Sequence, residues 1–521
     1  MRKFGYGVAL TLLVVVAAIA FVFWPTPPVS VTPSNSNLVQ SPSTVAQSVP
    51  ASHSAIETGS TTGAVSAQLR LGPVPGHETA YREFFGALVA GYNAAQSATV
   101  VSLEFVPEEI DQKWNPAIRG QFWEWWTDYA VEHALDLLIV PREVIPELAL
   151  RKEIVALDPF FESGTVHLDD ILPDFRDLAR FQGKHYGLPL TFTAYVLVLN
   201  NAMLKPGSAG TGRDWSPLLP LDTLSELPPP PSQEVATWDD LEQLMTWSMG
   251  TPFAYRRRFA PLIVDFPSDF TWLWLMMAVQ EGAKPISHTG RVDLAHEGFR
   301  LAFDRLRRWE QAELVYEYPT PFKLKPTDPQ FERITGVSDH WLSRIISFEQ
   351  QRTGLTLADL GPFYRVVPLP SGSSDAILRD SLDVEVWDYT AVIMNRAPDV
   401  QLAAWRFLEW VVKSDVLAAV IANPEYPLLP ATRFLYDHPI LKAAIQENYQ
   451  RSGAVGALGR YVSLPLVPAL REVRRIIDKH FNRAWQGEAS LEEALAQAEA
   501  EANETIYRAT EPKAMGGGGE K

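Results

Sequence analysis

The residues that best match a recognisable chemistry are aromatic side chains that stand next to polar ones. Phe270-Thr271-Trp272 and Trp387-Asp388-Tyr389 combine rings with hydroxyl or carboxylate groups in stretches that a helix face explains poorly, and Tyr186, Tyr195 and Tyr426 are similar isolated candidates. A pyranose ring needs this combination, because its C–H faces stack on aromatic rings while its hydroxyls need donors and acceptors. These residues therefore indicate a carbohydrate-binding surface, with core packing as the alternative for each of them.

Other aromatic residues are better explained by helix packing. Four of them are spaced i, i+3, i+4 and i+7, which predicts one buried helix face: Phe122, Trp125, Trp126 and Tyr129. Trp405 and Trp410 fall in a strongly helical stretch and predict core packing as well. Trp114 and Trp123 lie off the shared face, so we expect them to be exposed in a ligand cleft.

Motifs of known enzymes are missing from the sequence. It contains no G-x-S-x-G elbow, no H-E-x-x-H zinc motif and no Walker loop. Carboxylates are abundant, but a glycosidase needs two of them facing each other across a cleft, which a sequence does not establish. The sequence therefore does not support an enzyme, although it does not exclude one. An enzyme that uses a carboxylate pair stays open as an alternative.

The overall composition limits the class of partner. The chain has 521 residues, of which 46% are hydrophobic and 21% charged, which predicts a globular protein with more than one lobe. A net charge of −17 repels phosphate backbones, and Arg256-Arg257-Arg258 is only a short basic run, so no nucleic-acid partner is expected. Cysteine is absent, which excludes disulfides, thiolate metal sites and a lipid-modified N-terminal cysteine.

The N-terminal region predicts export to the cell surface. Arg2-Lys3 precede an uncharged apolar stretch, Phe4–Trp24, that is long enough to cross a bilayer. Ala18-Ile19-Ala20 allows a cleaved signal peptide instead, but the apolar run continues past it, so we favour an uncleaved anchor in residues 1–24. Residues 25–67 are rich in Ser, Thr and Pro and predict a disordered tether. Residues 511–521 predict a flexible tail.

Between tether and tail, strand and helix patterns alternate. Strands are predicted at 68–74, 100–106 and 136–140, and helices at 79–92, 121–134, 237–248, 397–414 and 490–508. This alternation predicts βαβ units around a mostly parallel sheet, with sites at the carboxyl ends of strands. Two helices begin with a capping box, formed by Thr237 with Asp240 and by Ser490 with Glu493. Residues 205–236, rich in glycine and proline, predict an irregular surface insertion.

Several short motifs occur in an order that is typical of one protein family. Gly183-Lys184-His185-Tyr186-Gly187-Leu188-Pro189, followed by a strand at 196–200, is similar to a G-K-x-Y-G-L-P turn and the strand that follows it. Further motifs match at 136–140, 154–160, 170–175, 237–241, 404–408 and 490–494. Together they resemble the extracellular solute-binding proteins of ABC importers, in particular the sugar-binding branch that includes maltose-binding proteins. No single motif is specific, but their order from about residue 68 to residue 510 is.

The resemblance implies a fold and a function. The implied fold is α/β, periplasmic binding protein-like (class II), with two α/β lobes that close on a ligand in the cleft between them. The N-terminal transmembrane helix predicted from the apolar stretch is added to this fold. Lobe 1 would comprise residues 68–190 and 392–445, and lobe 2 residues 191–391 and 446–510. The implied function is to bind a sugar or oligosaccharide and to deliver it to the permease subunits of an ABC transporter. A protein with this function is expected not to be an enzyme and to need no cofactor or metal ion. We expect a monomer, anchored in the cell membrane with its binding domain on the extracytoplasmic side.

The resemblance also implies which residues bind the ligand. Loops after the first and third strands become His77-Glu78 and Arg142-Glu143, and the stretch before an aromatic-rich helix of lobe 2 becomes Asp269 to Trp272. With the aromatic candidates and the residues near the lobe crossings, the predicted set is His77, Glu78, Trp114, Arg142, Glu143, Thr191, Thr193, Tyr195, Asp269, Trp272, Gln350, Trp387, Asp388 and Tyr389.

Three departures from the family pattern affect the ligand more than the fold. Trp387-Asp388-Tyr389 replaces small glycines that are common in the family, which predicts a narrower pocket or one built around stacking. The 205–236 segment is longer than the usual connector, and the usual lipid-bearing cysteine is missing. Two alternatives stay open: a surface carbohydrate sensor or adhesion module on the same fold, and a secreted carbohydrate-active enzyme.

Overall fold

The computed structural model describes fourteen stretches of the chain, and every structural statement below concerns them. They are residues 67–72, 79–96, 99–104, 119–192, 196–200, 235–249, 260–264, 269–317, 333–338, 364–372, 377–378, 390–423, 428–447 and 454–510. All of them belong to one compact unit, residues 64–521. The predicted anchor, nearly all of the tether, most of the 205–236 insertion and the glycine-rich tail lie outside the described residues.

The first sheet combines four strands that precede the second sheet in the sequence with one strand that follows it. Its order is β2 (Thr99–Leu103), β1 (Ala67–Gly72), β3 (Leu137–Val140), β14 (Thr390–Ile393) and β6 (Leu188–Pro189). β1 is parallel to β2 and β3, whereas β14 is antiparallel to β3 and β6. All four residues of β3 and of β14 are buried, as expected for the centre of a sheet that helices cover on both faces.

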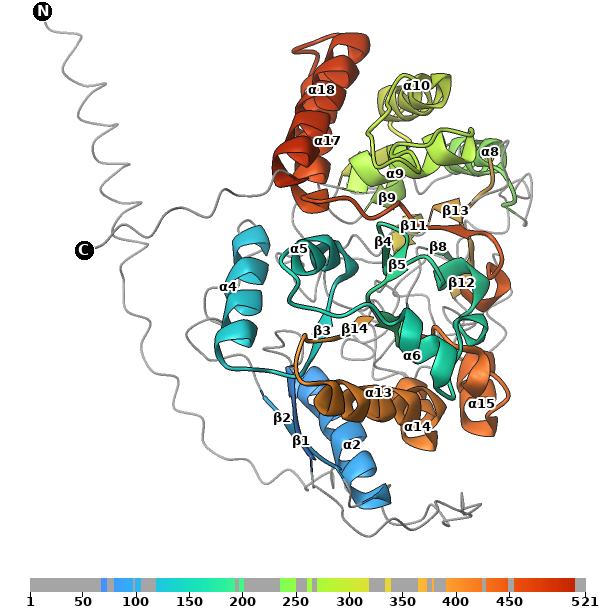
Figure 1. Ribbon diagram of the computed structural model, residues 1–521. Coiled ribbons are helices and arrows are strands. Elements are labelled where there is room, and N and C mark those ends of the chain that lie inside the picture. Colours follow the sequence, from blue (N-terminus) through green and yellow to red (C-terminus); the bar gives the residue numbers. More distant parts are fainter. Residues whose placement is uncertain are drawn as a thin grey trace, which may run out of the picture. The chain divides into compact units, whose positions relative to one another are not determined.

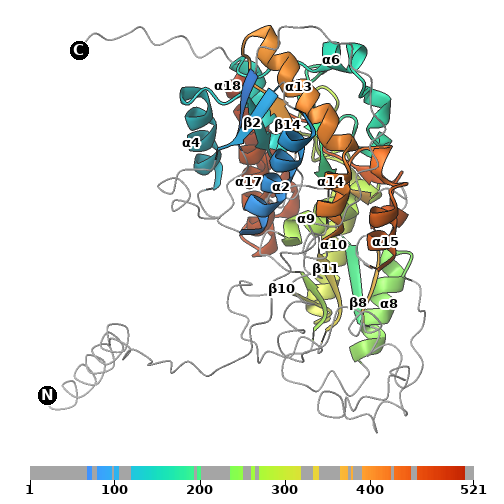
Figure 2. The ribbon, with the colours of Figure 1, turned by 90° about the horizontal axis from the view of Figure 1, so that it is seen from below.

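The second sheet repeats this pattern with other strands. Its order is β10 (Val315–Glu317), β9 (Ala260–Val264), β11 (Arg333–Ser338), β8 (Val196–Asn200) and β12 (Tyr364–Pro368). β9 is parallel to β10 and β11, and β8 is antiparallel to β11 and β12. Each sheet therefore has three adjacent parallel strands. A fourth strand pairs with the third in antiparallel orientation, and the fifth pairs with the fourth in the same way. Figure 2 shows β2 and β14 in one group of elements and β8, β10 and β11 in another.

Helices pack on each sheet (Figure 1). On the first sheet, α2 (Thr79–Ala95) contacts β2, and α13 (Pro398–Lys413) contacts β1 and β14. Outside them, α14 (Asp415–Ala422) packs on α2 and on α15 (Pro439–Glu447).

The second sheet has its own helices. On it, α8 (Trp238–Met249) contacts β9, and α9 (Asp269–Gln280) packs between α10 (Glu297–Gln311) and α17 (Leu470–Trp485). The remaining helices are α4 (Arg119–Glu132), α5 (Ile145–Leu150), α6 (Asp158–Ser163) and α18 (Leu491–Thr510), with short 3₁₀ turns η3 (Arg142–Val144), η4 (Leu168–Asp170), η5 (Pro173–Phe175) and η11 (Arg433–Leu435).

Short strand pairs occur along the crossing segments of the chain. β7 (Thr191–Phe192) pairs with β15 (Leu429–Pro430), and β13 (Ile377–Leu378) pairs with β16 (Tyr461–Val462). β4 (Arg180–Phe181) and β5 (Lys184–His185) form a hairpin whose two loop residues, Gln182 and Gly183, both have a positive φ, of 50° and 81°. That backbone is the tight turn that suits twisted strands, and it explains the glycine of the G-K-x-Y-G-L-P motif.

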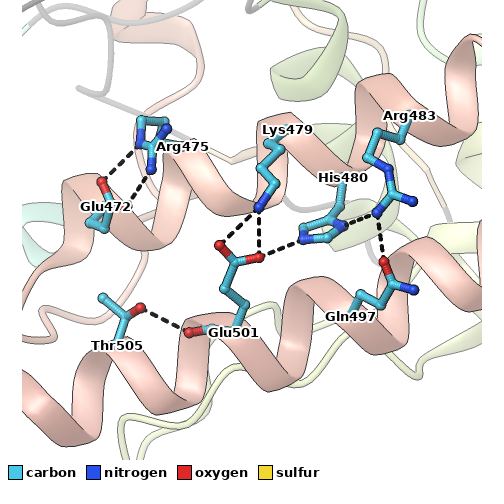
Figure 3. Close-up of polar contacts among 8 residues, drawn as sticks. All are labelled: Glu472, Arg475, Lys479, His480, Arg483, Gln497, Glu501 and Thr505. Atoms are coloured by element: carbon cyan, nitrogen blue, oxygen red, sulfur yellow. Dashed lines mark hydrogen bonds and ion pairs between the residues drawn. The ribbon is translucent and has the colours of Figure 1, made fainter.

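The two C-terminal helices α17 and α18 pack side by side, joined by a polar network on one flank (Figure 3). Glu501 of α18 accepts hydrogen bonds from Lys479 Nζ at 2.9 Å and pairs with His480 Nε2 at 2.8 Å. Arg483 Nη1 donates to Gln497 Oε1 at 2.6 Å and lies 3.3 Å from His480 Nδ1. His480 is buried, so its ring is fixed between Glu501 and Arg483.

Local features predicted from the sequence are mostly confirmed. Both capping boxes form: Asp240 N donates to Thr237 Oγ1 at 3.1 Å while Thr237 N donates to Asp240 Oδ2 at 2.8 Å, and Ser490 and Glu493 make the same reciprocal pair. Trp126 and Trp405 are buried in the core as expected.

The reading of the 270–272 stretch as non-helical is wrong. Phe270, Thr271 and Trp272 form the first turn of α9, which is buried on all sides. The resemblance placed these residues just before an aromatic-rich helix, but they belong to it. A helix that is apolar all round has no amphipathic period, and the sequence pattern therefore did not show where it begins. In the described part of the chain, each helix is too short or too polar to span a bilayer.

Candidate functional site

The carboxyl end of β3 leads directly into two predicted site residues. β3 ends at Val140, Pro141 turns the chain with an extended backbone, and Arg142 and Glu143 begin η3. Both side chains are almost fully enclosed, with 1% of Arg142 and 4% of Glu143 exposed. Buried charges at the carboxyl end of a parallel strand lie where α/β proteins bind ligands.

Arg474 of α17 joins Glu143 to a third predicted residue, Trp272. Arg474 Nη1 lies 2.9 Å from Glu143 Oε1, and its guanidinium carbon lies 4.5 Å from the centroid of the Trp272 ring. The Trp272 side chain is 6% exposed and that of Arg474 11%. The structure therefore brings together a carboxylate, a guanidinium group and an indole in one enclosed place. Glu143 follows a strand of the first sheet, while the other two come from helices that pack beside the second.

Two further hydrogen bonds connect the same segments. Arg142 Nη1 donates to the backbone oxygen of Leu464 at 2.7 Å, and the backbone N–H of Ala469 donates to Glu147 Oε1 at 2.8 Å. Ala469 has a left-handed backbone, with φ of 55°, and is the residue that precedes the first turn of α17. The carboxylate of Glu147, from α5, therefore lies at the helix end that favours negative charge.

Burial and nearby charges together shift the pKa values of the two carboxyl groups of this cluster in opposite directions. Burial raises the pKa of Glu143, but Arg474, Arg471 and Arg142 outweigh this effect, so the pKa lies below its usual value. For Glu147, burial raises the pKa and dominates over its hydrogen bonds and Arg471. Glu143 is therefore held as a carboxylate, whereas the protonated form of Glu147 is favoured relative to water.

Aromatic and polar contacts hold Trp272 in place. The neighbouring Thr271 Oγ1 donates to Asp478 Oδ1 on α17, and Asn482 Nδ2 donates to the same carboxylate. Phe270 packs on Trp485, with ring centroids 5.4 Å apart. Because these contacts fix α9 on α17, Trp272 and Arg474 keep their relative position.

The structure describes only some of the predicted site residues. Arg142, Glu143 and Trp272 lie in the cluster, and Thr191 lies buried on β7, where it pairs with Pro430. Asp269 is the first residue of α9, but its side chain is outside the described atoms. The others lie outside the described residues: His77, Glu78, Trp114, Thr193, Tyr195, Gln350, Trp387, Asp388 and Tyr389. Within the described part, no three His, Asp or Glu side chains gather to form a metal site.

Sequence reasoning missed Glu147, Arg471 and Arg474. Glu147 follows Glu143 at i+4, and the two arginines, spaced i, i+3, share a face of α17. That spacing was a usable signal. It did not identify a site, because charged pairs with this spacing most often lie on solvated helix surfaces.

A family model described as bacterial extracellular solute-binding protein matches residues 129–447. Solved structures with the same fold cover 85% of this chain. The sugar-binding protein MalE from the phytopathogen Xanthomonas citri is 18% identical, with a TM-score of 0.64 over 98% of its chain. The cyclic alpha-maltosyl-1,6-maltose binding protein from Arthrobacter globiformis is 15% identical, with a TM-score of 0.62 over 100% of its chain.

A third solved structure is an ABC substrate-binding protein from Listeria monocytogenes in complex with cycloalternan; it is 15% identical, with a TM-score of 0.58 over 99% of its chain and 85% of this one. No curated protein matches the sequence significantly. These likenesses confirm the predicted two-lobe α/β fold.

Proposed function

Because the chain belongs to the bacterial extracellular solute-binding proteins, we propose that it is the substrate-binding protein of an ABC importer. It binds a sugar or oligosaccharide between its two lobes and delivers it to the permease subunits of that importer. The observation that carries the proposal is the meeting of Glu143 with Arg474 and Trp272. These three groups come from elements beside different sheets, as expected for a ligand held between lobes.

The chemistry of the cluster suits a sugar. The indole of Trp272, over which Arg474 lies in this structure, is of a type that stacks on sugar C–H groups, and the carboxylates accept hydrogen bonds from hydroxyls. Among the described residues, Glu147 Oε2 and Ser463 Oγ are buried and have no hydrogen-bond partner. A ligand rich in hydroxyl groups would supply a hydrogen-bond partner to each of these two atoms. The solved structures that share this fold, two of which carry sugar-binding names, support the same class of ligand.

Lobe closure is the proposed mechanism. The Glu143–Arg474 ion pair and the bonds from Arg142 to Leu464 and from Ala469 to Glu147 each join proposed lobe 1 (68–190, 392–445) to proposed lobe 2 (191–391, 446–510). Opening the lobes breaks all three contacts and lets water reach the charged groups. A ligand that binds both lobes favours the closed state, because it supplies contacts to both sides at once.

The remaining predicted ligand residues outside the described part stay in the proposed site. The predicted anchor at residues 1–24 would hold the binding domain on the extracytoplasmic side of the membrane. We propose a monomer, with a sugar and permease subunits as partners and no nucleic acid.

Thermal unfolding of the full-length protein in the presence of a saccharide panel tests the assignment. A ligand at about 100 times its Kd raises the free energy of unfolding by about 2.7 kcal/mol, so one class of saccharide should raise the Tm clearly. If no saccharide raises the Tm, the sugar assignment fails.

Two further measurements separate transport from the alternatives. A receptor returns its saccharide unchanged after long incubation, whereas an enzyme converts it. Uptake of the labelled saccharide should fall when either this protein or its permease is deleted. A phenotype that survives deletion of the permease would instead identify a sensor or adhesion module.

A further inference from the structure

Ala469, the residue before α17, has a backbone that is unusual for its position. Its φ of 55° and ψ of 31° lie in the left-handed region, whereas the residue before a helix normally has an extended backbone. Among the described residues, four other non-glycine residues have a positive φ, and each follows a helix or lies in a hairpin turn, where this backbone is common: Ala134, Lys152, Gln182 and Glu313. Ala469 therefore carries backbone strain that the start of a helix does not require.

Two hydrogen bonds hold Ala469 between different parts of the molecule. Its N–H donates to Glu147 Oε1 of α5 at 2.8 Å, and its carbonyl oxygen accepts from the N–H of Val473 in α17 at 2.9 Å. Helix α17 is in turn fixed to α9 by the bond from Thr271 to Asp478. Glu147 belongs to proposed lobe 1, and α9 and α17 belong to proposed lobe 2. Ala469 is therefore a point at which the backbone joins the two lobes.

The chain just before Ala469 has little freedom to rotate. The carbonyl oxygen of Leu464 is bound by Arg142 of lobe 1. Pro465 and Pro468 have fixed φ angles, and the residue before each proline is restricted as well. Since α17 begins directly after Ala469, a rotation of this helix relative to lobe 1 falls mainly on the φ and ψ angles of Ala469.

We propose that Ala469 is a conformational switch that opposes lobe closure. In the closed state, the bond to Glu147 holds Ala469 in the left-handed region. When the lobes open, this bond breaks and Ala469 returns to an ordinary backbone, so opening releases strain. The Glu143–Arg474 ion pair favours closure, and the strain at Ala469 offsets part of that effect, so that a ligand decides which state is populated. This inference rests on the proposed function, because it concerns the closure through which the saccharide is bound.

Distances between spin labels on the two lobes of the unliganded, full-length protein test the proposal. The chain has no cysteine, so Leu402→Cys in α13 and Gln311→Cys in α10 label one exposed position in each lobe. Glycine adopts the left-handed backbone without strain, so Ala469→Gly should raise the ratio of closed to open molecules about fivefold. An unchanged ratio overturns the proposal, and so does a wild-type protein that is already fully closed.

Ala134→Gly is the matched control. Ala134 has a φ of 53°, follows α4, and donates its N–H to the carbonyl oxygen of Val131 in the preceding turn. The substitution removes the same kind of strain at a place far from the contacts between the lobes. It should raise the Tm and leave the ratio of closed to open molecules unchanged. Equal increases of this ratio in Ala134→Gly and Ala469→Gly would contradict the proposal.

A second substitution shows whether Glu147 imposes the strain. Glu147→Ala removes the acceptor of the Ala469 N–H and should lower the ratio of closed to open molecules. In this background Ala469→Gly should change the ratio less than twofold, because the closed state no longer requires a left-handed backbone. A full fivefold effect there would overturn the proposal. If circular dichroism shows that Glu147→Ala is unfolded, Glu147→Gln replaces it, because the amide oxygen is a weaker acceptor than the carboxylate.

The two proposals fail in different ways. The label distances are measured without a ligand, so they decide the role of Ala469 whether or not a saccharide binds. If no saccharide raises the Tm, the proposed function fails. If a saccharide raises the Tm while Ala469→Gly leaves the ratio of closed to open molecules unchanged, only the switch at Ala469 fails.

Discussion

Glu143 and Arg474 are separated by 331 positions in the sequence, and their side chains meet at 2.9 Å. The pair joins the turn after β3 to a helix near the C-terminus. Because Glu143 is buried and Arg474 largely so, the ion pair compensates part of the charge of each group. This contact is therefore where the stability of the fold and the proposed ligand site depend on the same side chains.

Removal of Glu143 should be costly. Glu143→Ala leaves Arg474 without this carboxylate in an enclosed site, and we expect a loss of about 3–5 kcal/mol in the free energy of unfolding. Urea denaturation followed by tryptophan fluorescence measures the loss. The double variant with Arg474→Ala should lose less than the sum of the two single variants.

The control for this prediction is an exposed pair. Glu472→Ala removes a carboxylate that pairs with Arg475 on the surface of α17, and its expected cost is below about 1 kcal/mol. Similar losses in Glu143→Ala and Glu472→Ala would show that the buried pair has no special role.

Acid should destabilise the protein partly through Glu143. Its folded-state pKa lies below the unfolded value of about 4.3, so its contribution is complete above that value and is lost as the pH falls through the folded-state pKa. Unfolding curves between pH 7 and pH 3 should show a smaller loss of stability on acidification in Glu143→Gln than in the wild type.

Glu147 should behave in the opposite way. Its folded-state pKa is raised, so its contribution is present below about pH 4.3 and is lost as the pH rises through the raised value. Relative to the wild type, Glu147→Gln should therefore become more stable as the pH increases from 4 to 7. The two variants thus change the pH profile with opposite signs, and profiles that change with the same sign would be incompatible with the cluster.

The α17–α18 network should depend on Glu501. Glu501→Gln weakens the contacts with Lys479 and the buried His480, and we expect a loss of about 1–2 kcal/mol in the free energy of unfolding. Glu504→Gln is the matched control, because it removes only an exposed pair with Arg508 and should cost less than about 0.5 kcal/mol. Denaturation of both variants at neutral pH measures the difference. An indistinguishable pair of values would count against the network.

Gly187 should not tolerate a side chain. A Cβ at this position would lie 2.5 Å from Thr390 Cγ2 and 3.2 Å from Ala179 Cβ, so Gly187→Ala should cost about 1–3 kcal/mol. Gly86→Ala, in α2, meets nothing within 4 Å and should stabilise the protein by about 0.5–1 kcal/mol. Thermal unfolding of the two variants should therefore show Tm shifts of opposite sign.

Much of the fold could be predicted because its signals are local. The capping boxes at Thr237 and Ser490 depend on residues three positions apart, and the burial of Trp405 follows from the periodicity of its own helix. Family motifs such as the Gly183 turn are also short. Where the local signal was absent, as in α9, whose residues are apolar on every side, the helix begins earlier than was predicted.

The sequence by itself determined the alternating α/β architecture, the family and three members of the enclosed cluster, Arg142, Glu143 and Trp272. Only the tertiary structure decided that Arg474 joins them while its neighbour Arg475 remains exposed. Consecutive residues of a helix point about 100° apart, and which of them is buried depends on what packs against that helix. For Arg474, the packing partner lies more than three hundred residues away, beyond the range of any local pattern.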